Sequence, residues 1–312
     1  MDFKRVRHLL PLLLLGTITA ACGEQPAPSE AQTITKKVLL IGLDGIRVDI
    51  LATADTPHID ALIDQGTFSD TAYTRMPTVS GPGWSSMTIG VWADKHGVMG
   101  NDFSDNDYAT YPDFLTRLEQ INPAFNTFAV LDWPPLGTTA DGGPMISDAI
   151  DVKINIDGDS LGYRVADSLA VVAAVDHLTN ENPDAAFVYL GNTDVIGHDT
   201  NSLAPEYQAE IETADVYVGA LVAALTQRPT YAKEDWLILM STDHGRRDDG
   251  GHGGDSPLEH QIFYLASGPS AVNGIPAAPP NIIDVAVTAL AHLGVAIDPA
   301  WGLDGQVVGL ND

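Results

Sequence analysis

The sequence predicts an α/β fold, in which helices cover both faces of a mostly parallel central sheet. The first observation is a set of three continuous apolar runs, which have the character of strands buried on both faces. They are KVLLIGL at 37–43, AFVYL at 186–190 and WLILMS at 236–241. The second observation is that each run ends in a polar turn and that helical patterns separate the runs. This alternation is typical of βα units, whose strands are parallel.

Local start and stop signals place the remaining elements. Pro57 lies at the start of the helical segment 56–65, and Gly66 follows its end, which is the usual arrangement of these two residues. The segment 161–178 carries an apolar stripe. In chain order the sequence predicts strands at 37–43, 127–131, 186–190, 236–241 and 262–266, and helices at 56–65, 84–89, 113–120, 161–178, 205–225 and 282–293.

Composition excludes several classes of protein. The chain has 312 residues, of which 45% are hydrophobic, and 42 Asp and Glu against 15 Lys and Arg give a net charge of −27. This balance disfavours a nucleic-acid polymer as a partner, because phosphate backbones are bound by clustered Lys and Arg. The single cysteine excludes an internal disulfide framework. A large globular core is expected instead.

The N-terminal segment predicts export. Lys4, Arg5 and Arg7 precede a short apolar run at 9–18, and small residues lead into Cys22, as in a bacterial lipobox. We expect a signal peptide at 1–21, a lipoprotein tether at 22–36 and a single folded domain at 37–312. The protein would then be an exported lipoprotein of the bacterial cell envelope, periplasmic or anchored to the membrane through Cys22. Thr19 departs from the usual lipobox, so an ordinary signal peptide with an incidental cysteine is the alternative.

Carboxylates and imidazoles follow the predicted strands. In mostly parallel sheets, ligands bind at the carboxyl ends of the strands, where these side chains would converge. Nitrogen and oxygen ligands of this kind suit one or two divalent cations, zinc first, with manganese or iron as alternatives. Asp44 alone is also explained as a helix cap. The candidate ligands are Asp44, Asp194 and His198 in a polar loop, Asp243, His244 and His252.

Ser80 is the candidate nucleophile. It precedes Gly-Pro-Gly at a predicted helix start, where backbone N–H groups and the helix dipole favour an anion. The alternative is that Ser80 only caps the helix. Thr78 and Ser241 are the nearest rival hydroxyls.

Taken together, the motifs LLIGLDG, MPTVSGPGW, HGVMGN, YLGNTDVIGH, STDHG and GHGG resemble the alkaline phosphatase superfamily. Within it, the chain is most similar to type I phosphodiesterases and nucleotide pyrophosphatases, from residue 38 to about 267. The resemblance implies an alkaline phosphatase-like catalytic domain with a two-metal site at the strand ends. It also implies cleavage of a small phosphate ester through a Ser80 phospho-enzyme.

The resemblance distributes roles among the motif residues. Asn101 would hold a non-bridging phosphate oxygen, and the N–H of Gly81 would share that role. His252 follows His244 closely, whereas the last histidine ligand of nucleotide pyrophosphatases commonly lies far downstream. If His252 is only structural, His260 is the fallback ligand. One metal would be held by Asp44, Ser80, Asp243 and His244, and the other by Asp194, His198 and His252.

Substrate class stays open between related reactions. The resemblance favours phosphodiester or nucleotide-type bonds. A phosphomonoesterase would need an arginine for the dianion, for which Arg246 or Arg247 are available unless they are surface residues. A sulfatase would need a Pro-Ser-Arg cassette after its nucleophile, whereas Gly-Pro-Gly follows Ser80. The non-enzymatic alternative is a metal-dependent binding lipoprotein of the envelope.

Overall fold

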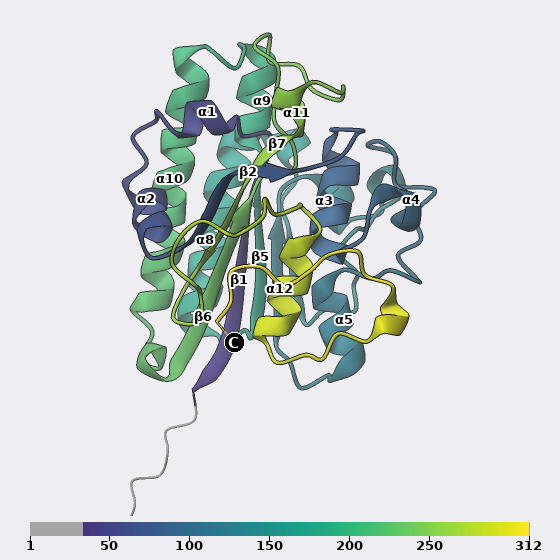
Figure 1. Ribbon diagram of the computed structural model, residues 1–312, viewed down its shortest axis with the longest axis vertical. Coiled ribbons are helices and arrows are strands. Elements are labelled where there is room, and N and C mark those ends of the chain that lie inside the picture. The colour runs from purple at the N-terminus through teal and green to yellow at the C-terminus, as the bar shows by residue number, and fades with distance from the viewer. Residues whose placement is uncertain (1–33, 312) are drawn as a thin grey trace, which may run out of the picture. The chain divides into compact units, whose positions relative to one another are not determined.

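A seven-stranded sheet runs through residues 34–311, the part of the chain that the computed structural model describes (Figure 1). The predicted signal peptide and Cys22 lie outside these residues. The strand order is β2-β7-β6-β1-β5-β3-β4. The strands are β1 (Thr35–Leu43), β2 (Gly66–Tyr73), β3 (Thr127–Leu131), β4 (Val152–Asn155), β5 (Ala185–Leu190), β6 (Glu234–Ser241) and β7 (Gln261–Ser267).

The mostly parallel sheet is confirmed, with one exception. β1 pairs in parallel with β5 and β6, and β3 pairs in parallel with β4 and β5, whereas β7 is antiparallel to both β6 and β2. The sequence did not predict β2 or β4. Both lie at the edges of the sheet and are partly exposed, so they lack the continuous apolar run of a central strand.

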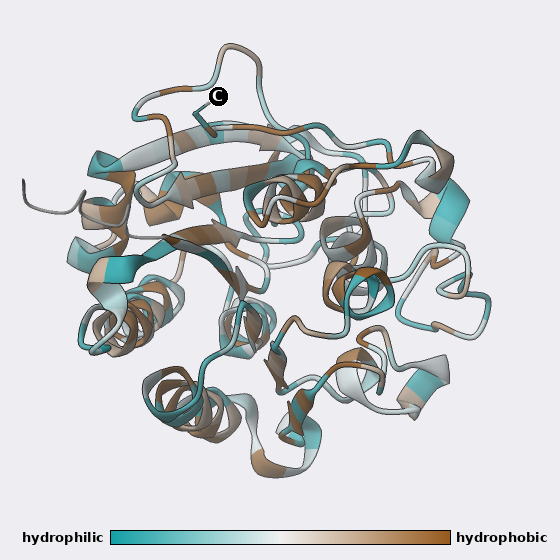
Figure 2. Ribbon diagram, turned by 90° about the horizontal axis from the view of Figure 1, so that it is seen from below, coloured by the Kyte–Doolittle hydropathy of each residue, from teal (hydrophilic) through white to brown (hydrophobic). Residues whose placement is uncertain are grey.

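Alternate residues of the central strand β1 pack into two hydrophobic cores, one on each face of the sheet. Val38 and Leu40 of β1 pack on one face, and Leu39 and Ile41 pack on the other. Figure 2 shows helices on both sides of the sheet. Each fully buried Leu or Ile contributes about 1.5–3 kcal/mol to folding. The first face is covered by α3 (Ser80–Ile89), α5 (Phe114–Ile121) and α12 (Asp284–His292), and the second by α1 (Val48–Leu51), α2 (Pro57–Asp64), α8 (Tyr163–Asn180) and α10 (Pro205–Thr226).

Two predicted helices differ from the structure. The segment 161–178 is divided by Gly162, whose φ of +82° suits glycine and separates α7 (Gly158–Leu161) from α8. α3 begins at Ser80, four residues before the predicted start at 84. The remaining short helices are α4 (Ala93–His96), α6 (Pro134–Gly137), α9 (Asn192–Asp199), α11 (Pro257–His260), η1 (Ala140–Gly142), η2 (Tyr231–Lys233) and η3 (Pro299–Trp301).

The sheet topology brings three chain-distant turns together. β6, β1 and β5 are neighbours and run in parallel, so their carboxyl ends meet at one edge of the sheet. The segments that follow these strands therefore share one site. Within the described residues, no helix has both the length and the apolar content needed to cross a membrane.

Candidate active site

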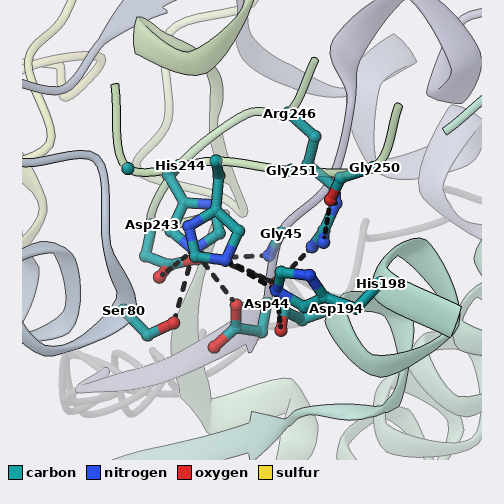
Figure 3. Close-up of polar contacts among 12 residues, drawn as sticks. Asp44, Gly45, Ser80, Asp194, His198, Asp243, His244, Arg246, Gly250 and Gly251 are labelled. Carbon is teal, nitrogen blue, oxygen red and sulfur yellow. Dashed lines mark hydrogen bonds and ion pairs between the residues drawn. The ribbon is translucent and has the colours of Figure 1, made fainter. Parts of the chain in front are cut away.

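The predicted ligands converge at the carboxyl ends of β1, β5 and β6 (Figure 3). Asp44 directly follows β1, and Asp243 and His244 follow β6. Asp194 and His198 do not lie in a loop, as predicted, but on helix α9. Their spacing of four residues places both side chains on one face of that helix.

The first cluster surrounds the ring of His244. Its Nε2 atom lies 3.3 Å from Ser80 Oγ, 3.6 Å from Asp44 Oδ1 and 3.3 Å from Asp243 Oδ2. His244 Nδ1 donates a 3.0 Å hydrogen bond to the carbonyl oxygen of Gly245, which leaves the lone pair of Nε2 facing the three oxygens. Asp44 Oδ1 and Asp243 Oδ2 are buried and have no hydrogen-bond partner among residues 34–311.

The electrostatics of this cluster suit a bound cation. Burial raises the pKa of Asp44 from its ordinary value of 3.8 to about 7, and the charge of Asp194 adds to the rise. Burial likewise raises the pKa of Asp243 well above its ordinary value and lowers that of His244. Buried carboxylates need a paired charge or a metal. The donor atoms therefore fit a divalent metal ion, which would satisfy the two free oxygens.

Two aromatic residues hold Asp44 in place. Its Oδ2 accepts hydrogen bonds from the Tyr189 hydroxyl at 2.6 Å and from Trp84 Nε1 at 2.8 Å. Both donors contact the same oxygen, so Oδ1 stays turned toward His244. Supporting contacts of this kind orient metal ligands and are part of a metal site.

The second cluster consists of Asp194, His198 and His252. The Nε2 atoms of the two histidines are 2.9 Å apart, and each lies 3.5 Å from an oxygen of Asp194. His252 Nδ1 donates to the carbonyl oxygen of Thr78 at 2.9 Å, which directs the lone pair of its Nε2 into the cluster. His198 is about half exposed, so this cluster opens toward solvent.

Asp194 links the two clusters. Among the described residues, two groups of acidic and histidine side chains have geometry suited to a metal ion, namely Asp194 with His198 and His252, and Asp44 with Asp194 and His244. Carboxylate and imidazole donors without a thiolate suit zinc and related divalent ions. The residues present therefore fit metal binding on both sides of Asp194.

The raised pKa of Asp44 gives the metal-free protein a testable pH dependence. Between about pH 4 and pH 7 the unfolded state has lost this proton while the native state retains it, so rising pH favours unfolding. Asp44→Asn removes the effect. In thermal melts with chelator, we expect the variant to gain stability over wild type progressively from pH 4 to 7. A constant difference across this range would contradict the argument.

Asn101 and Gly81 contact each other beside Ser80. Gly81 N–H donates to Asn101 Oδ1 at 2.9 Å, so the amide nitrogen of Asn101 remains available to another acceptor. A Cβ at position 81 would lie 2.1 Å from the Gly100 carbonyl oxygen, so only glycine allows this approach. The Gly81 N–H is already engaged, and its predicted contact with phosphate would require this bond to break.

Arg246 is not the surface arginine that the sequence suggested. Its side chain is fully buried, forms an ion pair with Asp194 Oδ1, and donates through Nε to the Gly250 carbonyl oxygen at 3.0 Å. A Cβ on Gly45 or Gly197 would collide with its guanidinium. Arg246 therefore pairs with the candidate metal ligand Asp194. Its guanidinium is engaged by Asp194 and by the Gly250 carbonyl oxygen, and it is not available to a substrate. Nothing in the sequence around Arg246 indicated that it would pair with Asp194.

Several alternative residues are occupied elsewhere. His260 bonds to the Thr74 carbonyl oxygen at 2.8 Å and to Asp255 at 2.7 Å, and it joins neither metal group. Of the rival hydroxyls, Thr78 Oγ1 donates to the Gly254 carbonyl oxygen and Ser241 Oγ to that of Phe263. Of the three candidate hydroxyls, Ser80 is therefore the one that contacts the ring of His244. It is the first residue of α3, after Val79 as N-cap, and not the cap itself.

Known proteins resemble the chain over most of its length. The family model for type I phosphodiesterase / nucleotide pyrophosphatase matches residues 38–136 and 144–248. Human bis(5'-adenosyl)-triphosphatase ENPP4 is 23% identical over 83% of this chain and 58% of its own. An uncharacterized pyrophosphatase/phosphodiesterase of Schizosaccharomyces pombe is 23% identical over 67% of this chain and 44% of its own. The chain spans about half the length of these curated relatives.

Solved structures share the fold. An inactive variant of murine ectonucleotide pyrophosphatase / phosphodiesterase 5, in complex with AMP, has a TM-score of 0.66 at 16% identity and covers 85% of this chain and 96% of its own. A 2-O GAG sulfatase has a TM-score of 0.66 at 14% identity and covers 87% of this chain and 73% of its own. The family model spans the strand ends that carry Asp44, Asp194 and Asp243, and the chain belongs to the type I phosphodiesterase / nucleotide pyrophosphatase family of the alkaline phosphatase superfamily.

Proposed function

We propose that the protein hydrolyses phosphate esters, with phosphodiester or nucleotide-type bonds preferred, and that Ser80 is the nucleophile. The observation that carries the proposal is the position of Ser80 Oγ, 3.3 Å from His244 Nε2 and beside two buried oxygens without partners. Family membership supports the reaction class. We propose zinc as the metal, with one ion on each side of Asp194.

The chain supplies orientation and charge for a double displacement. The two clusters would hold divalent ions, which when bound would supply Lewis-acid stabilisation of charge on oxygen and phosphorus. Ser80 is the first residue of α3, where the helix dipole favours an anionic phosphate. In the first step Oγ bonds to phosphorus and its proton passes to solvent water, while the bond between phosphorus and the leaving oxygen breaks and the departing alkoxide takes up a proton from water. In the second step water bonds to phosphorus, the Oγ–P bond breaks and Ser80 regains its proton.

The arginines favour a diester over a monoester. A monoester brings a second negative charge, which a free guanidinium commonly binds in bidentate fashion. Arg246 is buried against Asp194 and Gly250, and Arg247 donates to Glu259 at 2.6 Å. Asn101 offers a neutral donor, which suits the single charge of a diester. The names of the relatives, a bis(5'-adenosyl)-triphosphatase and a protein bound to AMP, support a nucleotide-type substrate.

A substrate panel tests the reaction class. Bis-p-nitrophenyl phosphate, p-nitrophenyl phosphate and p-nitrophenyl sulfate are compared with and without a chelator. We expect the highest kcat/KM for the diester and loss of turnover with chelator. A preference for the monoester or the sulfate would reject the diester assignment, and no metal-dependent turnover of any substrate would favour a binding protein.

The amide of Asn101 provides a smaller, separate effect on rate. Asn101→Ala removes one donor to the developing charge on phosphorus, and removal of such a donor typically lowers kcat by about 10²–10³-fold. We expect a loss of this size on the diester with unchanged metal content. Asp102→Ala, at the exposed neighbouring position, is the matched control and should retain kcat. Equal rates for Asn101→Ala and wild type would remove Asn101 from the mechanism.

A further inference from the structure

Thr78 joins the nucleophile segment to the loop that follows β6. It lies two residues before Ser80 and is 1% exposed. Its Oγ1 donates to the Gly254 carbonyl oxygen at 2.9 Å and accepts from the Gly253 N–H at 3.0 Å. Its own carbonyl oxygen accepts from His252 Nδ1 at 2.9 Å. One residue thus binds three consecutive residues of another loop.

The loop depends on contacts of this kind for its shape. Residues 250–254 contain four glycines around His252 and no helix or strand. Glycine gives the unfolded loop a wide choice of conformations, and Gly253 adopts a φ of +101°. The hydroxyl of Thr78 fixes the backbone on one side of His252, and the carbonyl fixes the ring itself. His252 Nε2 is thereby held 2.9 Å from His198 Nε2.

We infer that Thr78 is a positioning residue for the second metal cluster, formed by Asp194, His198 and His252. This inference rests on the proposed function. Thr78 orients His252 as a ligand and holds the metal-binding loop against the segment that presents Ser80. Outer contacts of metal ligands typically change metal affinity by about 10–100-fold when removed.

Metal titration of four variants tests the inference without relying on turnover. Thr78→Val removes the hydroxyl at nearly constant volume, Thr78→Ser keeps it, and His252→Ala removes the ligand. Each chelator-treated protein is titrated with Zn²⁺ against a chromophoric chelator. We expect Thr78→Val to bind the second ion about 10–100-fold more weakly, His252→Ala to bind it at least as weakly as Thr78→Val, and Thr78→Ser to resemble wild type. The double variant, which combines Thr78→Val with His252→Ala, should bind the second ion no more weakly than His252→Ala alone. Both substitutions act on the same interaction, the contact between His252 and the ion.

Thr88→Val is the matched control. Thr88 is fully buried on α3, and its hydroxyl donates to the Trp84 carbonyl oxygen at 2.8 Å, away from the loop. It should lose some thermal stability and keep both metal affinities. If Thr78→Val does not fold, Thr78→Ala makes the same comparison.

Two results overturn the inference in different ways. If His252→Ala loses the second ion while Thr78→Val retains it with wild-type affinity, Thr78 serves stability alone. If His252→Ala itself binds both ions like wild type, the second cluster is not a metal site and the proposed function loses that part as well.

Discussion

Ser80→Ala is expected to abolish nearly all turnover of a phosphodiester. The change removes the oxygen that would bond to phosphorus, and loss of a covalent nucleophile costs on the order of 10⁴-fold or more in kcat. Metal content should fall little, because Asp44, Asp243 and His244 remain around the first cluster. Single-turnover rates together with metal analysis of the same sample make the measurement.

A neighbouring serine provides the control for this variant. Ser85 is fully buried on the same helix, and its hydroxyl forms a 2.7 Å hydrogen bond with the Tyr108 hydroxyl, remote from His244. Ser85→Ala should keep kcat within a few-fold of wild type. Near-normal turnover in Ser80→Ala with metals bound would mean that water attacks phosphorus directly.

Asp243→Asn is expected to abolish turnover through loss of metal. The neutral amide removes one negative charge from the first cluster, where Asp243 Oδ2 lies 3.3 Å from His244 Nε2. The metal ion that stabilises the reacting oxygens would then bind weakly. At the same time, the metal-free variant should melt at a higher temperature than metal-free wild type at pH 8. Burial raises the pKa of Asp243 in the native state, so wild type loses stability relative to its unfolded state as pH rises above the ordinary Asp pKa, and Asn does not.

Asp248, in the loop that follows β6, provides the control that distinguishes loss of metal from a general change in net charge. Asp248 is mostly exposed and pairs with Arg47. Asp248→Asn should retain turnover and bound metal, since Arg47 keeps its ion pair with Asp49. If Asp243→Asn kept both its metal and its activity, the first cluster would be misassigned.

The strands were predictable from the sequence where burial on both faces of the sheet requires a continuous apolar run. β1, β5 and β6 are central strands, and their apolar runs gave nearly correct bounds. β2 and β4 were missed because an edge strand packs against fewer neighbours and tolerates polar residues. The reversed direction of β7 has no local signal, since direction depends on how the connecting loop returns to the sheet.

The convergence of the candidate ligands was predictable for a related reason, and the residues that contact and orient them were not. Asp44, Asp194 and Asp243 follow strands, and parallel strand ends must meet. Arg246 and Thr78 act through atoms that are distant in sequence, a carboxylate 52 residues away and a loop 174–176 residues away. Their side chains carry no periodic or motif signal. Only the folded chain shows that Arg246 fills the space left by Gly45 and Gly197.

The stereochemistry at phosphorus tests the central claim most directly. Each in-line displacement inverts the configuration at phosphorus, so attack by Ser80 followed by attack of water gives two inversions. The protein is incubated with a phosphorothioate diester of defined configuration at phosphorus in ¹⁸O-labelled water, and the configuration of the product is determined. Transfer to methanol in place of water allows the same comparison. We predict overall retention. Overall inversion would show a single displacement by water and would contradict the role of Ser80 as nucleophile.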